Sequence, residues 1–470
     1  MRGGLLFFLS IGLWLAAPLP GLAAEPMRLA EVLASVERHY PLLDAARRDQ
    51  QGADAELLAS RGAFDPVLRA RVDGAPLGYY QNGRADLLID MPTPLWGTSV
   101  FVGHRVSFGK FADYDGKLET NQYGELRAGL AIPLLRNGLT DRRRAQIERA
   151  ELGVPLSVAA TKQAKIEAAR AASVRYFEWV AAGQRLRVLR ALFELADKRD
   201  HAMGERVRQG DLARVDRVDN RRTVLGRQGA VIQAQRALQA ATIELSMFLR
   251  DERGLPVLPD ESRLPPSLPP PHDVPSAEDM AQRARDTTQA LRDRPELERL
   301  RLLREQLRVE RDLARNQALP SLDVLALVSQ DFGPGSPTRA PTVIEGGVSM
   351  EIPTLNRAAR GRRQAAEAGM ARLSAQERLT ADRIAAEVND ALWALSASRQ
   401  RLQVAQEELR LAAEVEEAER TRFTLGDSNI LFVNLREQAT AEAALREIDA
   451  LLDNHRAHAA YRAAIALDGK

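Results

Sequence analysis

The sequence contains no cysteine, so the chain can form no disulfide bond and perform no thiolate chemistry. It also lacks a charge imbalance, because 66 basic residues are matched by 64 acidic ones that are interspersed as on solvated helix faces. This balance gives no support to nucleic-acid binding. No Gly-x-Ser-x-Gly elbow is present, and the glycine-containing residues 331–335 are not followed by a helix start. We predict neither a cofactor nor an enzymatic activity.

Long apolar runs are also missing beyond the first residues. Leu5 to Ala17 is apolar but short for a membrane span, follows a positive Arg2, and is broken by Pro18. Small residues then offer a cleavage site, which predicts a signal peptide over residues 1–24, with an N-terminal membrane anchor as the alternative. We therefore expect an exported protein, and any part of it inside a membrane would consist of β-strands.

Residues 357–461 contain no proline and few glycines, and they are rich in strong helix formers. We predict one helix over residues 357–425, about 100 Å long at 1.5 Å per residue. Gly426 suits a left-handed C-cap, after which the chain returns, so residues 357–466 form a long helical hairpin. A similar hairpin is predicted over residues 138–250, with its turn at Gly210.

Two regions alternate between apolar and polar residues with the period of a β-strand, within residues 64–134 and within residues 320–353. In the first, Leu126, Ala128, Leu130 and Ile132 share one face. Such strands fit either a half-buried soluble sheet or a barrel with lipid outside and water inside.

The second half of the chain restates the first. Pro41 and Pro295 each open a helix, and Pro66 and Pro320 each start a strand, at the same offset of 254 (295−41 and 320−66). For the matching pair Pro133 and Pro353, which end the strands, the offset has fallen to 220 (353−133). The first half therefore carries about 34 extra residues, roughly 76–109. We divide the chain into a first repeat (25–254), a proline-rich linker (255–276) and a second repeat (277–470).

Each repeat reads as helix, strand, strand and long helical hairpin. We expect four strands per chain, with the hairpin predicted inside residues 76–109 lying outside this set. Four strands cannot close a barrel, and open edges aggregate in water and are not tolerated in lipid. The predicted fold is therefore mainly α with a membrane β-barrel contribution, assembled from several copies into a tube of helices continuous with a barrel.

These features resemble the TolC-like family of bacterial outer-membrane efflux and secretion channels, over essentially the whole mature chain. The resemblance rests on the duplication, residues 132–138 (IPLLRNG), and the two turns around Gly210 and Gly426. It implies a homotrimer in the outer membrane with twelve strands and a large periplasmic helical domain. It also implies a passive channel of a tripartite efflux pump or type I secretion system, served by a periplasmic adaptor and an inner-membrane transporter. The alternative is a periplasmic coiled-coil adaptor or scaffold.

Candidate site residues lie at the hairpin tips. The resemblance implies adaptor contacts at Gly210, Asp211, Gly426 and Asp427, and a gate of carboxylates six and nine residues after each tip glycine. The first tip fits this pattern and the second does not. The gate candidates are Asp216 and Asp219 on the first hairpin, with Phe432 and Leu435 at the equivalent positions of the second.

Asp216 and Asp219 have a second interpretation as ordinary solvated charges on a helix face. His455 and His458 lie one helical turn apart, but no complementary acidic residue or cysteine stands near them in the pattern, so we expect surface histidines and not a metal site. The transported substance is not encoded in any motif, since partner proteins select it.

Overall fold

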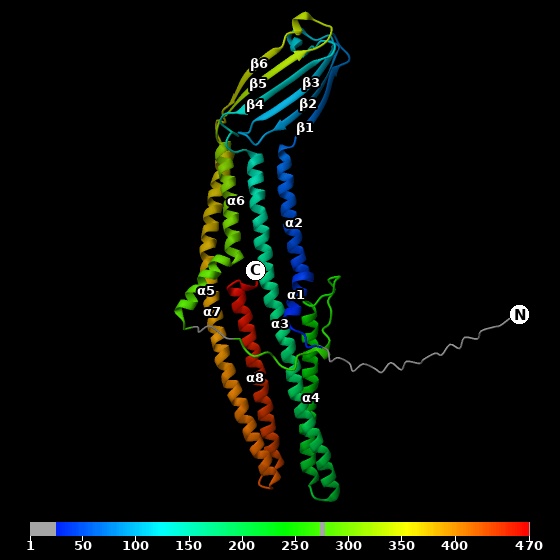
Figure 1. Ribbon diagram of the computed structural model, residues 1–470, viewed down its shortest axis with the longest axis vertical. Coiled ribbons are helices and arrows are strands. Elements are labelled where there is room, and N and C mark those ends of the chain that lie inside the picture. The colour runs from blue at the N-terminus through cyan, green and yellow to red at the C-terminus, as the bar shows by residue number, and fades with distance from the viewer. Residues whose placement is uncertain (1–24, 273–277, 470) are drawn as a thin grey trace, which may run out of the picture.

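The computed structural model describes residues 25–272 and 278–469. The predicted signal peptide (1–24) and residues 273–276 of the predicted linker lie outside these described residues. The molecule is elongated, with a β-sheet at one end and two helical tips at the other (Figure 1). In the described part of the chain, no helix is both long and apolar enough to cross a membrane.

Two helices of 68 residues each, α3 and α7, run along most of the molecule and are about 100 Å long. Each forms an antiparallel hairpin with the helix that follows it, so the long hairpins predicted from the sequence are present. The bounds of the helices are α1 Leu29–His39, α2 Pro41–Arg61, α3 Arg142–Gln209, α4 Arg214–Ser246, α5 Met280–Asp293, α6 Pro295–Gln317, α7 Arg357–Thr424 and α8 Ile430–Ala464.

Local sequence explains where these helices begin. Pro41 and Pro295 occupy the first helical position of α2 and α6, where the missing N–H costs nothing and the fixed φ suits a helix. The Asp141 carboxylate caps α3 by accepting a hydrogen bond from the backbone N–H of Arg144 at 2.9 Å. Asn429 caps α8 in the same way, accepting from the N–H of Phe432 at 3.2 Å.

The strands form one antiparallel sheet of six strands in the order β1-β2-β3-β4-β5-β6. Strand β4 of the first repeat pairs with β5 of the second, from Glu125↔Asp331 to Pro133↔Asp323, so the two repeats share the sheet. The bounds of the strands are β1 Val67–Ala75, β2 Asn82–Pro92, β3 Ser99–Gly109, β4 Glu125–Pro133, β5 Ser321–Asp331 and β6 Val343–Glu351.

The expectation that residues 76–109 lie outside the strand set is wrong, and the described residues form six strands where we expected four. Strands β2 and β3 are inserted between β1 and β4 and pair with both. Charge fixes this arrangement: Asp86 of β2 binds Arg84 at 2.8 Å, Arg105 of β3 at 2.9 Å, and Arg127 of β4 at 2.9 Å. The inserted hairpin is therefore tied to the strands that both repeats contain.

The two faces of the sheet differ sharply, because paired residues point to the same side. One side, which we call the apolar face, carries almost only hydrocarbon side chains. The other, the charged face, carries the charged side chains of the strands. Representative residues of the apolar face are Leu68, Val72, Leu87, Ile89, Val102, Leu126, Leu130, Val328, Ile344 and Val348. Representative residues of the charged face are Arg69, Arg71, Asp86, Asp90, Arg105, Glu125, Arg127, Asp323, Glu345 and Glu351.

Within residues 25–272 and 278–469, no α-helix packs extensively against either face of the sheet. The main hydrophobic core lies instead halfway along the helical part, where α1, α3, α4 and α8 meet. Trp179 is fully buried there and its indole N–H donates to the Thr242 hydroxyl at 3.2 Å. The Tyr176 hydroxyl donates to the carbonyl of Met27 at 2.8 Å and holds the segment before α1 against α3.

A proline-rich strap, residues 255–272, crosses this core region from α4 towards α5 (Figure 1). Arg187 of α3 donates to the carbonyl of Pro265 at 2.9 Å, and His455 of α8 donates through Nε2 to the carbonyl of Pro269 at 3.0 Å. The expectation that His455 is a surface residue is wrong. It is fully buried under the strap and stacks on Phe177, with ring centroids 4.2 Å apart.

Candidate functional site: the hairpin tips and the throat

The two hairpin tips lie at the end of the molecule opposite the sheet (Figure 1). Gly210 and Gly426 have φ values of 86° and 85°, in the left-handed region that favours glycine. At each tip two backbone hydrogen bonds close the helix end. Gly210 N–H donates to Val207 O at 3.2 Å and Asp211 N–H to Arg206 O at 2.9 Å, and at the second tip Gly426 N–H donates to Phe423 O at 3.1 Å and Asp427 N–H to Arg422 O at 2.9 Å. The two repeats therefore end in the same turn geometry.

The adaptor-contact candidates are all on the surface of these tips. Asp211 and Asp427 are exposed, and Asp427 makes an ion pair with Arg422 at 3.4 Å. A side chain added at Gly210 or Gly426 would meet no atom within 4 Å, so neither glycine is required by close packing. Each is required by its turn.

The gate candidates occupy the first two turns of α4 and α8 and are all exposed in the single chain. Asp219 forms an ion pair with Arg222 at 3.2 Å. Asp216 lines a cavity between the two tips, whereas Asp219, Phe432 and Leu435 do not. The structure therefore brings Asp216 together with the second hairpin and leaves the other three on the open surface.

The cavity between the tips has a volume of about 540 Å³. Its lining mixes apolar side chains with arginines and backbone-capping polar residues, and both hairpins contribute. The lining residues are Arg199, Ala202, Met203, Arg206, Leu212, Asp216, Phe423, Ser428, Asn429, Ile430 and Leu431. A groove of this kind can hold the end of another helical hairpin through apolar contacts and hydrogen bonds to its turn.

A buried charge cluster behind this cavity was not predicted from the sequence. Glu437 of α8 is only 2% exposed and binds Arg199 of α3 at 3.1 Å, Arg227 of α4 at 3.3 Å and Arg420 of α7 at 3.4 Å. Burial raises the pKa of Glu437, but the hydrogen bond and charge of Arg199 and the charges of Arg227 and Arg420 outweigh it, so the pKa is lowered overall. One carboxylate thus joins all four helices of the two hairpins.

A sequence signal for this cluster existed. Val433, Glu437 and Ala441 are spaced by four residues and all three are buried on α8. An acidic residue inside such an apolar stripe indicates a buried partner of opposite charge.

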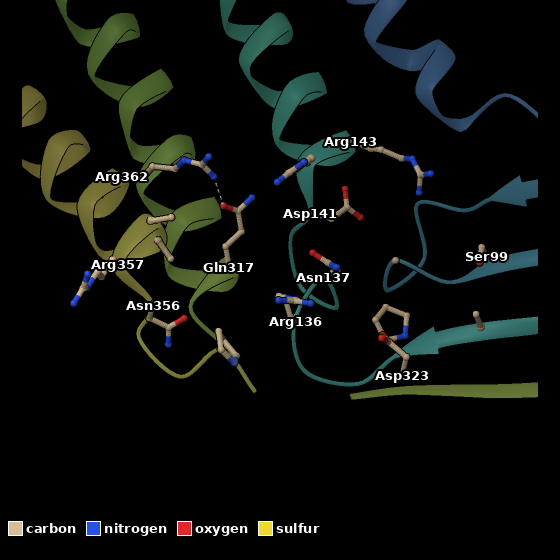
Figure 2. A pocket seen from close by; sticks show the side chains of 17 residues that line it. Ser99, Arg136, Asn137, Asp141, Arg143, Gln317, Asp323, Asn356, Arg357 and Arg362 are labelled. Atoms are coloured by element: carbon tan, nitrogen blue, oxygen red, sulfur yellow. Dashed lines mark hydrogen bonds between the residues drawn. The ribbon is translucent and has the colours of Figure 1, made fainter. Parts of the chain in front are cut away.

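A second cavity, which we call the throat cavity, lies where the helices meet the sheet and has a volume of about 860 Å³. Ser99 and Asp323 in its lining belong to the charged face of the sheet, so the cavity opens on that side. Figure 2 shows Arg136, Arg143, Arg357 and Arg362 around it, with Arg362 donating to Gln317 at 3.0 Å.

Positive charge dominates the throat cavity. The side chains of Arg142, Arg143 and Arg357 make no ion pair with any described residue. The N-termini of α3 and α7 begin at Arg142 and Arg357 and add the positive ends of two helix dipoles. The cavity therefore favours anions, a property that the sequence analysis did not predict.

No group of three or more histidine, cysteine, aspartate or glutamate side chains within residues 25–272 and 278–469 is arranged to hold a metal ion. The buried His455 uses one ring nitrogen on the strap, as described above. The tips and the throat remain the two places where chemistry-bearing side chains gather.

A sheet with one apolar face that no described helix covers, above two hairpins whose longer helices are about 100 Å long, fits a class of protein: a channel subunit with a membrane end and a long periplasmic end. Residues 287–467 match the family model described as outer membrane efflux protein. The resemblance to the TolC-like outer-membrane channel family is thereby confirmed, and with it the location in the outer membrane with a large periplasmic helical domain. Members of this family act as channels.

Solved structures agree with this fold. The chain is similar to the MtrE outer membrane channel of Neisseria gonorrhoeae in its open state, with 16% identity and a TM-score of 0.66 over 93% of this chain and 89% of that one. The CmeC channel of Campylobacter jejuni is 14% identical, with a TM-score of 0.65 over 93% of this chain and 85% of that one. The outer membrane protein VceC of Vibrio cholerae is 14% identical, with a TM-score of 0.64 over 93% of this chain and 96% of that one. No curated protein matches this chain in sequence.

Proposed function

We propose that three copies of this chain form a continuous tube that serves as the passive outer-membrane channel of a tripartite efflux pump or type I secretion system. The observation that carries this proposal is the apolar face of the sheet, which no helix in the described part of the chain covers and which fits lipid. The charged face then turns towards a water-filled lumen, because charged side chains are costly against lipid. The chain would act as a duct and catalyse no reaction.

The two repeats support the proposed division into residues 25–254, a linker (255–276) and residues 277–470. Each repeat supplies one long hairpin to the helical tube, and the strap ties the two together at the core. The throat cavity would open into the lumen at the junction of barrel and tube. Its arginines would attract anionic groups on passing solutes.

The hairpin tips support docking to a periplasmic adaptor that is itself bound to an inner-membrane transporter. Gly210 and Gly426 give the two tips matching left-handed turns, and the cavity that both hairpins line would accept the tip of a partner hairpin. Asp216 and Asp219 would ring the periplasmic mouth, with Phe432 and Leu435 on the neighbouring turns.

The experiment that tests this function combines fractionation with transport. The protein, expressed in its host, should be recovered from the outer-membrane fraction only with detergent, migrate as a trimer, and restore solute export to a strain from which its gene has been deleted. A protein released from the periplasm as a soluble monomer would instead support an adaptor or scaffold.

A further inference from the structure

The sheet leaves two open edges, on β1 and on β6. Six antiparallel strands are an even number, so β6 runs opposite to β1, and the β6 edge of one copy can pair antiparallel with the β1 edge of the next. An inserted hairpin preserves this relation because it adds two strands. All six strands of a copy can therefore belong to one closed barrel.

Apolar side chains on the two edge strands are more exposed than apolar side chains on an inner strand. Ile344 on β6 and Val72 on β1 are 82% and 79% exposed, whereas Leu126 and Leu130 on the inner strand β4 are 49% and 36% exposed. All four residues lie on the apolar face, so lipid contact alone does not explain the difference. The edge residues lack the neighbouring strand that covers the flank of an inner residue.

The charged face of the two edges is complementary. Strand β1 presents Arg69 and Arg71, and strand β6 presents Glu345 and Glu351. These four side chains have partners within the chain, yet 48% to 72% of each remains exposed. The acidic Asp73 of β1 lies on the same face, is only 38% exposed, and is bound by Arg71 and by Arg84 of β2. Opposite charges on facing strands stabilise a pairing, and like charges at this seam would oppose it.

We propose, on the basis of the proposed function, that the trimer closes an eighteen-stranded barrel through a seam between β6 of one copy and β1 of the next. The partner at each edge is a second copy of this chain. The barrel has six strands from each copy, in place of the four that the family resemblance implies.

The consequence is a wide membrane pore. With strands about 4.8 Å apart and tilted by about 40°, eighteen strands give a backbone diameter of about 36 Å, and twelve give about 24 Å. Inward side chains take up about 6 Å on each side, which leaves a bore of about 24 Å. Two packed helices of about 10 Å each pass through such a bore. The membrane segment therefore admits bulky cargo of the size of a helical hairpin, and size selection falls to the helical tube.

Disulfide cross-linking tests the seam on a clean background, because the chain has no cysteine. Val72→Cys on β1 is combined in turn with Ile344→Cys, Gly346→Cys and Val348→Cys on β6, which lie on the same face and cover the possible registers. The matched control combines Val72→Cys with Leu130→Cys on β4, which would be a neighbour of β1 only if β2 and β3 left the barrel. Each variant is oxidised in outer membranes and run on a denaturing gel.

We expect at least one β1–β6 pair to give covalent trimers and the β1–β4 pair to give no cross-link. A β1–β4 cross-link within one chain, or trimers in which no β1–β6 pair reacts, would overturn the eighteen-stranded barrel and leave the channel function intact. Covalent ladders that stop at dimers, or loss of the trimer in the unmodified protein, would overturn the proposed trimeric channel itself.

Bore size gives a second readout in planar bilayers. Neutral polymers of increasing radius should enter the extracellular side of the purified trimer up to a radius of about 12 Å, compared with about 6 Å for a twelve-stranded barrel. Exclusion already near 6 Å from that side would contradict the wide pore.

Discussion

Acid should loosen the strap over His455, because protonation of a buried imidazole is costly. Burial lowers the pKa of His455 from 6.5 to about 4, although the hydrogen bond to Pro269 acts in the opposite direction. A histidine whose pKa is depressed in the fold contributes full stability above pH 6.5, and this contribution is lost as pH falls from 6.5 to about 4. At pH 5 the linkage relation gives a loss of about 2 kcal/mol, or about thirtyfold in the equilibrium for local opening.

Hydrogen exchange followed by mass spectrometry measures this opening in the intact trimer in detergent. Peptides covering residues 264–272 should lose about thirtyfold in protection between pH 7.5 and pH 5, after correction for the intrinsic pH dependence of exchange. The matched variant His455→Gln keeps a side-chain N–H that can reach the Pro269 carbonyl but does not titrate. In a background that also carries His458→Gln, which removes the second buried imidazole beside the strap, its protection should be nearly independent of pH over the same range.

His458 must be separated from this effect. Burial, with the nearby His272 and Arg462, lowers its pKa to about 4, and its ring stacks on His272 with centroids 4.2 Å apart. The comparison is therefore repeated in a His458→Gln background. An equal pH dependence with and without the His455 imidazole would refute the reasoning, because the titrating group would then lie elsewhere.

Three further predictions concern the tips. Glu437→Gln leaves buried arginines without a compensating charge and should cost about 3–5 kcal/mol locally, seen as faster hydrogen exchange in both hairpins near the tip, whereas unchanged exchange would show that the cluster contributes little. Gly210→Val strains a left-handed turn by roughly 1–2 kcal/mol and should reduce export without loss of the trimer, while the control Gly226→Val, in a helical position with open space around it, should keep export. Asp216→Asn with Asp219→Asn should lower cation selectivity in single-channel recordings, and unchanged selectivity would identify both as solvated helix charges.

The helices could be predicted from the sequence because their signals are local. Pro41, Pro295 and the long stretch without proline mark starts and lengths directly, and α2 and α6 begin at the two predicted prolines. The inserted hairpin was misjudged although its alternation was visible. The strand count was taken from the duplication, and the second repeat has no counterpart to β2 and β3. Asp86 shows that the inserted hairpin belongs to the sheet, because its partners Arg105 and Arg127 become its neighbours only when the strands pair.

Buried polar groups were the hardest to foresee, because their environment is assembled from distant segments. Glu437 acquires partners from α3, α4 and α7, and its nearest partner in sequence, Arg420, is 17 residues away. His455 is buried by Pro269, 186 residues earlier in the chain. A helical pattern shows which side of α8 is apolar, but it does not show which segment covers that side.

The widths of the two halves of the tube support the same strand count. Each copy contributes four columns of helices, formed by α3, by α7, by α2 above α4 and by α6 above α8 (Figure 1). At interaxial distances of 8–10 Å, four columns occupy an arc of about 32–40 Å. Six strands about 4.8 Å apart and tilted by about 40° occupy about 38 Å, and four occupy only about 25 Å. Strands β2 and β3 therefore allow the barrel to meet the helical tube at nearly equal circumference, so the chain passes from β4 into α3 without the inward taper that a twelve-stranded barrel would impose.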